Sequence, residues 1–231
     1  MRPLSEPGVN ELNARNKSAW NQLYASTSEL IWGCDPIGFL AECLPVGSAL
    51  PAGPILDAGA GEGRNLPPLL ALNRPVCACD ASAAALAKIP RTVAARISER
   101  VCDLEQTGYP DANFALILLS DTVETLPEPE PVLREMLRLL RRGGVLLANL
   151  PDHDDGVAGV NLQPAPGGGW LYQGKFFYRF FSIQEAESLF IGAGFELVAG
   201  HDCHWMEPPH PQFRDASHRH HSRVVLARRP A

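Results

Sequence analysis

The chain of 231 residues is 45% hydrophobic, which predicts a single domain built around a substantial core. Its formal net charge of -6 offers no general attraction for nucleic acid phosphates. Its apolar runs, such as residues 114–119, are far shorter than the roughly 18 residues of a membrane span. Six cysteines in a chain of this length do not form the dense disulfide framework of a small secreted domain. We therefore expect a cytoplasmic protein without a nucleic acid or membrane partner.

The first part of the chain, residues 1–46, is expected to be a helical segment that covers the main domain, which would occupy residues 47–231. Residues 1–15 are polar and are expected to be a chain end. Trp20 and Tyr24 follow at a spacing that places both on one face of a helix. An ordinary role in the core is an equally good interpretation of each aromatic residue.

The main domain is organised around residues 54–65, where an apolar run ends at Asp57 and enters a turn with glycines at every second position. Gly59, Gly61 and Gly63 allow positive φ angles and a close approach of the backbone to a ligand. This order predicts a buried strand, a ligand-binding loop and then a helix. The loop alone does not identify the ligand, because several kinds of nucleotide site use one.

The spacing of the loop narrows the choice of ligand. A dinucleotide-binding fingerprint needs a glycine where this chain has Arg64, and the Gly-Lys-Ser/Thr of a phosphate-binding P-loop is absent. The order Asp-x-Gly-x-Gly-x-Gly instead resembles the first motif of the class I S-adenosylmethionine-dependent methyltransferases. The following Glu-Gly-Arg-Asn resembles their tellurite-resistance and thiopurine-type small-molecule branch. The resemblance implies S-adenosylmethionine as cofactor, S-adenosylhomocysteine as product, and cofactor contacts from Asp57, Gly59, Ala60 and Gly61.

A second predicted strand, residues 75–80, also ends in an acid. Asp80 lies 21 residues after Gly59, where a carboxylate can accept hydrogen bonds from both ribose hydroxyls in either NAD or S-adenosylmethionine sites. Asp80 and Ala81 are therefore expected to contact the cofactor. The alternative is that Asp80 caps the helix expected over residues 81–88, and the two roles are compatible.

A third acid, Asp103, distinguishes an S-adenosylmethionine site from an NAD site. In the family that the chain resembles, an Asp at the position of Asp103 accepts from the adenine amino group and the next backbone amide, here Leu104, meets a ring nitrogen. The resemblance also implies that backbone near Ser120 holds the methionine amino group and that Arg64 pairs with the methionine carboxylate. A surface ion pair is the alternative for Arg64. Trp20 would lie over the cofactor.

The rest of the chain alternates strands with helices, which predicts an α/β fold. Residues 151–181 form an insertion rich in glycine and aromatic residues, expected to be a lid or hairpin over the substrate. A capping box at Ser182 and Glu185 opens a late helix. The resemblance implies a Rossmann-like, doubly wound sheet of seven strands in the order 3-2-1-4-5-7-6, with strand 7 antiparallel and helices on both faces. The last two strands are expected at residues 195–201 and 223–227.

Residues 201–221 hold six of the seven histidines. Imidazole and thiolate bind metal ions, but the spacing matches no structural zinc pattern. We expect no metal site here. A solvated loop, with a few histidines lining the acceptor pocket, is the favoured interpretation.

The leading hypothesis is a methyltransferase that acts on a small molecule. In-line displacement at a sulfonium depends mainly on alignment, so no catalytic base is required. Asp121, Glu124, His153 and His204 are candidates for such a base, and none is assigned. A nicotinamide-dependent oxidoreductase and a non-catalytic S-adenosylmethionine-binding protein are the alternatives. A thiol, a metalloid oxyanion, an amine and a hydroxyl all remain open as acceptors, and the sequence does not predict the oligomeric state.

Overall fold

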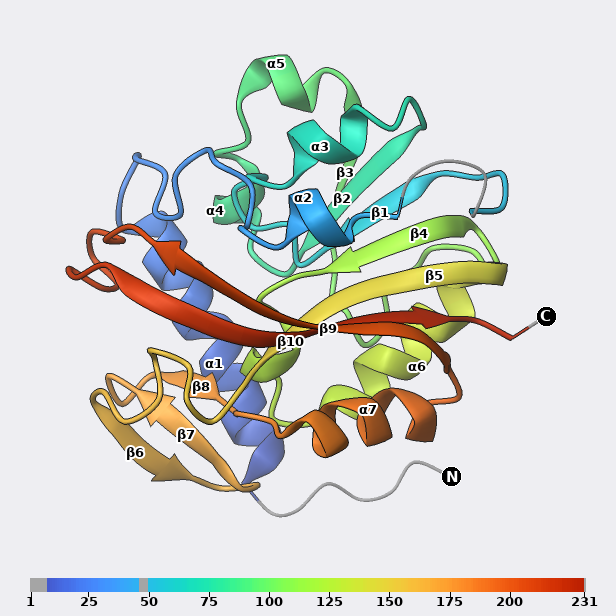
Figure 1. Ribbon diagram of the computed structural model, residues 1–231. Helices are drawn as coiled ribbons and strands as arrows, with labels where there is room; N and C mark the ends of the chain where they lie inside the picture. The colour runs from blue at the N-terminus through green and yellow to red at the C-terminus, as the bar shows by residue number, and fades with distance from the viewer. Residues whose placement is uncertain (1–7, 46–49, 231) are drawn as a thin grey trace.

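The structure is a computed structural model that describes residues 8–45 and 50–230. Its centre is one seven-stranded sheet with helices on both faces (Figure 1). The expected boundary between residues 46 and 47 lies outside the described residues. In chain order the strands of this sheet are β1 (Ile55–Ala58), β2 (Val76–Asp80), β3 (Ile97–Val101), β4 (Phe114–Leu119), β5 (Leu140–Pro151), β9 (Glu196–Glu207) and β10 (His218–Arg228).

The strand order is β3-β2-β1-β4-β5-β10-β9. Strands β1 to β5 are mutually parallel, and β10 is antiparallel to both β5 and β9. The predicted order and the antiparallel seventh strand are therefore confirmed. Because the order reverses beside β1, the crevice for a ligand lies at the carboxyl ends of β1 and β4.

Alternating side chains of the buried strands pack against helices on opposite faces. Leu56 and Ile117 face α6 (Pro129–Leu139) and α7 (Ile183–Gly192), whereas Ile55 and Leu116 face the other layer. That layer contains α2 (Leu40–Cys43), α3 (Leu66–Leu70), α4 (Ala83–Leu86) and α5 (Arg91–Ala94). The capping box predicted at the start of α7 is present. A 3₁₀ turn, η2 (Val123–Thr125), follows β4.

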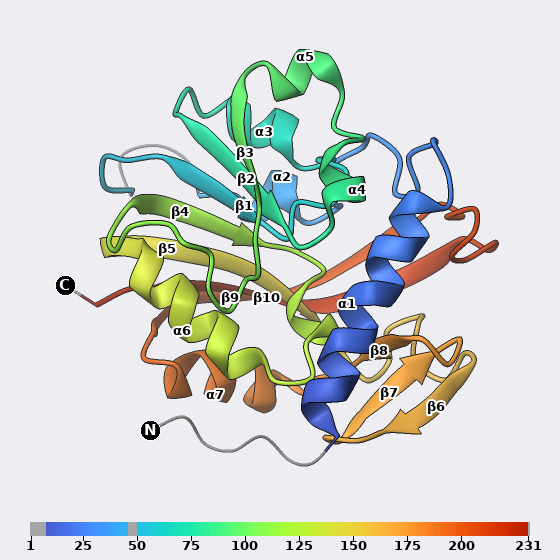
Figure 2. The same cartoon turned by 180° about the vertical axis from the view of Figure 1, so that it is seen from behind.

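The insertion forms a second, three-stranded antiparallel sheet rather than a single hairpin. Its strands are β6 (Leu162–Ala165), β7 (Gly169–Tyr172) and β8 (Phe176–Tyr178). It lies beside the long helix α1 (Val9–Ala25) in both views (Figures 1 and 2). The Phe177 amide donates a hydrogen bond to Asn16 Oδ1 at 2.9 Å, which joins the insertion to α1.

Two predictions about secondary structure are wrong. Residues 9–15 are not a polar end, because α1 begins at Val9 and buries Val9 and Leu12; residues 1–7 lie outside the described part. Residues 201–221 are not a solvated loop, because β9 and β10 pair along almost their whole length, as far as His218 opposite Glu207. Two polar segments can form this hairpin because each supplies the other's backbone hydrogen bonds. The hairpin continues past the sheet toward α1 (Figure 2). Across the described residues, no helix combines the length and apolarity needed to cross a membrane.

Candidate active site

A cavity of about 200 Å³ lies at the carboxyl ends of the parallel strands. The glycine loop and the residues after β2, β3 and β4 line one side of it. Helix α1, the insertion and the β9–β10 hairpin line the other side. The local strand-to-loop pattern therefore supplies half of the cavity, and segments remote in sequence close it.

The glycine loop has the conformation that its sequence predicted. Gly59, Gly61 and Gly63 all have positive φ angles, of 75°, 53° and 82°. A Cβ atom at Gly59 would lie 2.5 Å from Thr122 Oγ1, so a side chain here would also clash. The loop is held against β2 by hydrogen bonds from the Gly59 and Ala60 amides to the carbonyl of Cys79.

Asp57 is the most unusual group in this half of the site. Its side chain is buried at the end of β1, and neither carboxylate oxygen has a hydrogen-bond partner among the described residues. Burial, together with the nearby Asp80, raises the pKa of Asp57 to about 7. A buried acid without a partner is costly, so a cationic ligand group that supplied one would be bound favourably.

Asp80 has one of the two roles weighed for it, at the start of α4, and its contact with the ribose hydroxyls stays a prediction. Its Oδ1 accepts from the Ser82 amide at 2.8 Å at the start of α4, and its Oδ2 accepts from the Gly61 amide at 2.9 Å. It therefore orders the helix start and the glycine loop together. Asp80 and Ala81 also line the cavity, as the cofactor prediction requires. Burial raises the pKa of Asp80, and the amides of Ser82 and Gly61 oppose that rise.

Asp103 and Leu104 line the far end of the cavity, after β3. Asp103 Oδ2 forms an ion pair with Lys17 Nζ of α1 at 2.7 Å, and Lys17 also lies 3.7 Å from Glu105. This contact fixes α1 across the end of the pocket expected to hold adenine. The adenine contact itself stays a prediction.

Arg64 already has two acidic partners. Its guanidinium lies 3.2 Å from Glu207 on β9 and 3.1 Å from Asp121 after β4. Burial would raise the pKa of Glu207, but His210 and Arg64 outweigh it and lower the pKa to about 2. The ion-pair interpretation of Arg64 therefore describes this structure, and contact with a methionine carboxylate stays a prediction.

The turn after β4 is strained and held by side chains. Asp121 has a φ angle of 44°, in the left-handed region that non-glycine residues rarely adopt. Asn149 of β5 holds it there, accepting from the Asp121 amide and donating to its carboxylate, both at 2.9 Å. Ser120 accepts from Asn65 Nδ2 at 2.8 Å and lines the cavity. Nothing in the sequence points to this role of Asn149, because its partner is 28 residues away.

The aromatic cover consists of five side chains from three separate segments. The Trp20 ring lies tilted against Phe176 of β8, with centroids 4.6 Å apart, and against Phe213 of the β9–β10 connection at 5.5 Å; Phe213 contacts Trp32 at 5.1 Å. Tyr24, the fifth member, accepts from Trp32 Nε1. Trp20, Tyr24, Trp32 and Phe213 line the cavity. The prediction that α1 and the insertion meet at the site therefore agrees with the packing.

Glu62, in the glycine loop, binds the segment that carries Trp32 of this cover. Its Oε2 accepts from the Ile31 and Trp32 amides at 2.8 and 3.2 Å, and its Oε1 forms an ion pair with Lys88 at 2.9 Å. Glu62 belongs to the Glu-Gly-Arg-Asn motif noted in the sequence, but its structural role was missed. The reason is that its partners follow α1, about thirty residues earlier in the chain.

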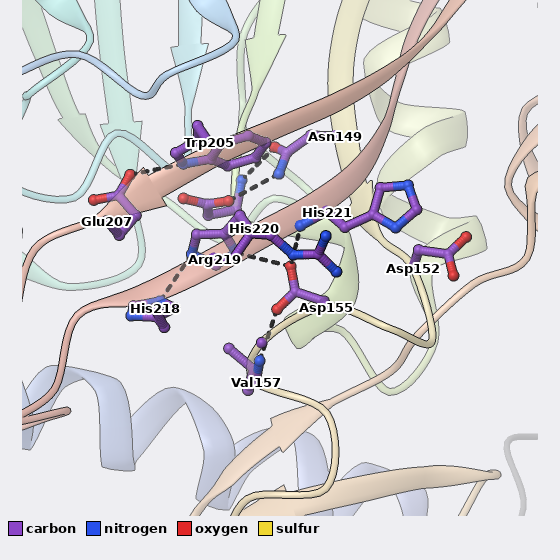
Figure 3. A network of polar contacts seen from close by, with 12 residues as sticks. Asn149, Asp152, Asp155, Val157, Trp205, Glu207, His218, Arg219, His220 and His221 are labelled. Carbon is purple, nitrogen blue, oxygen red and sulfur yellow. Dashed lines mark hydrogen bonds and ion pairs between the residues drawn. The ribbon is translucent and has the colours of Figure 1, made fainter.

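The other side of the cavity contains a buried chain of polar groups (Figure 3). Asp155 accepts from the amides of Val157 and His221 and contacts His220 Nδ1 at 2.9 Å; His220 Nε2 lies 3.0 Å from His218 Nε2. Burial would lower the pKa of His220, but Asp155 outweighs it and raises the pKa. Burial and then His220 lower the pKa of His218 to about 4.

Of the four candidate bases, the structure brings two into the cavity. Asp121 and Glu124 line it, whereas His153 and His204 are exposed and do not. His204 stacks on His221 on the outer part of the hairpin, where His221 also contacts Asp154 and Asp202. The histidines that do line the cavity are His210, His218 and His220. Their placement depends on strand pairing, which the sequence analysis did not predict.

Comparison with known proteins agrees with this geometry. The family model described as "Methyltransferase domain" matches residues 56–148. A probable S-adenosylmethionine-dependent methyltransferase of Mycobacterium tuberculosis is 28% identical over 173 residues. That match covers 75% of this chain and 58% of the relative, so the match spans little more than half of the relative's length.

Solved structures share the fold over the whole chain. The 1,6-didemethyltoxoflavin-N1-methyltransferase of Burkholderia thailandensis, determined with S-adenosylhomocysteine, has a TM-score of 0.67 at 20% identity and covers 100% of this chain and 93% of its own. The [4+2]-cyclase SpnF has a TM-score of 0.63 at 16% identity and covers 100% of both chains. Residues 56–148 thus match a methyltransferase domain, and the fold predicted from the sequence is shared with these solved structures. The Burkholderia enzyme was determined with S-adenosylhomocysteine, which agrees with the predicted cofactor. Assignment to the tellurite-resistance and thiopurine-type branch stays a prediction.

Proposed function

We propose that the protein transfers a methyl group from S-adenosylmethionine to a small-molecule acceptor by in-line displacement. The observation that carries the proposal is a set of three acids at the ends of adjacent strands: Asp80 and Asp103 line the cavity, and Asp57 is buried directly before the glycine loop that lines it. Each has a counterpart in the cofactor: an ammonium group, two ribose hydroxyls and an adenine amino group. The orphaned carboxylate of Asp57 fits the ammonium group best, because it gains a partner there.

The cofactor would supply an electrophilic methyl group at a sulfonium. The chain's own residues bind and orient it and keep water away. The glycine loop lets the backbone approach, and the strained Asp121 turn, fixed by Asn149, sets one wall of the cavity. The aromatic cover excludes water and presents ring faces that attract a sulfonium cation more than a neutral sulfide. Alignment of the acceptor then accounts for most of the rate.

The small-molecule acceptor is supported by a cavity of about 200 Å³, and the Burkholderia enzyme of the same fold was determined with 1,6-didemethyltoxoflavin bound. The net charge of -6 gives no support for a nucleic acid substrate. A cytoplasmic location is part of the proposal, and it is supported by six free cysteines in the described residues.

Two alternatives define the test. A nicotinamide-dependent oxidoreductase would use Asp80 but has no use for Asp103, and Arg64 replaces its third loop glycine. A protein of this fold that does not transfer methyl groups is the second alternative, because a similar structure is named as a cyclase.

Isothermal titration with S-adenosylmethionine, S-adenosylhomocysteine and NAD separates these possibilities. We expect binding of the first two ligands and no binding of NAD. Formation of S-adenosylhomocysteine in the presence of an acceptor then distinguishes transfer from binding alone. Preferential binding of NAD would refute the proposal.

A further inference from the structure

The acceptor half of the cavity is the part lined by Glu124, Asp155, Tyr178, Phe180, His218 and His220. These residues come from η2, the insertion and β10. Their chemistry bears on which acceptor the proposed methyltransferase uses.

Glu124 is the acid in this half with an unpartnered oxygen; His218 Nδ1 also lacks a partner among the described residues. Glu124 is 4% exposed, and its Oε2 has no hydrogen-bond partner among the described residues. The titratable groups that face it are Asp121, Asp155 and Tyr178, and none of them is a cation. Burial first, and then Asp121, raise the pKa of Glu124 well above its usual range. Burial and Asp121 therefore favour the protonated form of Glu124 more than water does.

The neighbouring acids are already satisfied. Asp155 accepts three hydrogen bonds, Asp121 is bonded to Asn149 and Arg64, and Glu207 is bonded to Arg64 and Trp205. Among the described residues that line the cavity near the acceptor half, Glu124 is thus the acid with an oxygen left for a ligand.

No cation in the described lining is without an acidic partner: His220, whose pKa Asp155 raises, is paired with Asp155. Lysine and arginine contribute Lys17 and Arg64 to this lining. Lys17 is paired with Asp103 and Glu105 at the far end, and Arg64 is paired with Glu207 and Asp121. A carboxylate, phosphate or metalloid oxyanion would therefore be desolvated next to Glu124 and Asp155 without a counter-ion, which is unfavourable.

An acceptor with an ammonium group suits this half of the cavity, whereas an anionic acceptor does not. It would satisfy the Glu124 carboxylate, and the rings of Tyr178, Phe180 and Trp20 line the same cavity and attract cations. Burial favours the neutral forms of both partners, so a proton moves readily from a buried ammonium to a buried carboxylate. Such a transfer frees the nitrogen lone pair that methylation requires.

We propose that the methyl acceptor is an amine, bound as its ammonium form by Glu124, which then accepts one proton from the nitrogen. This inference rests on the proposed methyltransferase function. Binding first displaces the resting proton of Glu124 to solvent. The amine nitrogen then forms a bond to the methyl carbon while the carbon–sulfur bond breaks and its electron pair remains on sulfur. The net products are a methylated ammonium ion, S-adenosylhomocysteine and one proton, which is the proton displaced on binding; Glu124 keeps the proton taken from the nitrogen and is again in its resting form when the product leaves.

The test uses three compounds with one aromatic body: 2-phenylethylamine, 2-phenylethanol and phenylacetate. Each is titrated calorimetrically into protein saturated with S-adenosylhomocysteine at pH 7, in two buffers of different ionisation enthalpy. We expect the amine to bind at least tenfold more tightly than the alcohol, phenylacetate not to bind, and about one proton to be released per amine bound.

Glu124→Gln keeps the shape of the side chain and removes its charge. We expect this variant to bind the amine at least tenfold more weakly, without proton release, and to bind S-adenosylhomocysteine and the alcohol as the wild type does. Glu99→Gln, at an exposed position on β3, is the matched control and should change nothing.

Two results would overturn the inference while leaving the proposed function intact: equal affinity of Glu124→Gln and wild type for the amine, or amine binding no tighter than that of the other two compounds. Failure of S-adenosylhomocysteine to bind in the first place would instead refute the proposed function.

Discussion

The buried carboxylate of Asp57 makes a quantitative prediction for Asp57→Asn. The pKa of Asp57 is about 7 in the folded protein against 3.8 for the free side chain. Folding raises this pKa. Between pH 3.8 and about pH 7, Asp57 is therefore protonated more often in the folded state than in the unfolded state. Stability is therefore highest at low pH and falls as the pH rises from about 4 to about 7.

The size of the loss in stability follows from the difference between the folded and unfolded pKa of Asp57. At 1.36 kcal/mol per pH unit, Asp57 costs the wild type roughly 2 to 3 kcal/mol more at pH 8 than at pH 5. Because the side chain is 1% exposed, no large correction for solvent screening applies. Asp57→Asn removes this pH dependence, so at pH 8 the variant without cofactor should melt about 5 to 10 °C above the wild type.

Differential scanning calorimetry at pH 5 and pH 8, with and without S-adenosylmethionine, measures the pH dependence of stability and the stabilisation by the cofactor. The cofactor should stabilise the wild type and have little effect on the variant, which lacks the charge opposite the ammonium group. Asp215→Asn, at an exposed position, is the control and should follow the wild type. A variant that loses stability with pH as the wild type does, or that retains full cofactor affinity, would refute the role given to Asp57.

Three further predictions concern the walls of the site. Asp80→Ala should weaken S-adenosylmethionine binding by about 10- to 100-fold in titration calorimetry, because ribose hydroxyls lose a charged acceptor; unchanged affinity would leave Asp80 as a helix cap only. Glu62→Gln should lower the free energy of unfolding in urea by about 1 to 3 kcal/mol, since two amides and Lys88 lose a charged partner; an unaltered midpoint would contradict this. Trp20→Ala should weaken binding of cationic S-adenosylmethionine more than that of neutral S-adenosylhomocysteine, and equal losses would show that the ring only packs.

The half of the site formed by the glycine loop and the strand ends could be predicted from the sequence, because it depends on neighbouring residues. The strand, glycine loop and acid of residues 54–65 depend on a steric property of glycine and on burial of a short apolar run, so their conformation follows from neighbouring residues. The acid Asp80 was placed correctly by the same reasoning. The sheet order came from the family resemblance to this motif, and the strand pairing confirms it.

The acceptor side was decided by contacts between residues far apart in the chain. His218 and His220 reach the cavity because β10 pairs with β9 well beyond the sheet, which the polar, histidine-rich sequence does not indicate. His153 and His204, equally plausible as bases in the sequence, are on the outside. Which face of a strand a side chain occupies depends on pairing register, and a shift of one residue reverses it.

The alternation of strands and helices, the glycine loop and the acids that end the first three strands could thus be predicted, because each depends on residues within one strand and turn. Three features depend instead on distant contacts: Glu62 holds the segment after α1, Arg64 is paired with Glu207 and Asp121, and Glu124 Oε2 is buried without a partner among the described residues. These properties depend on which distant side chains pack around a group. Burial and the charges nearby, rather than residue type, set the chemistry of a carboxyl group.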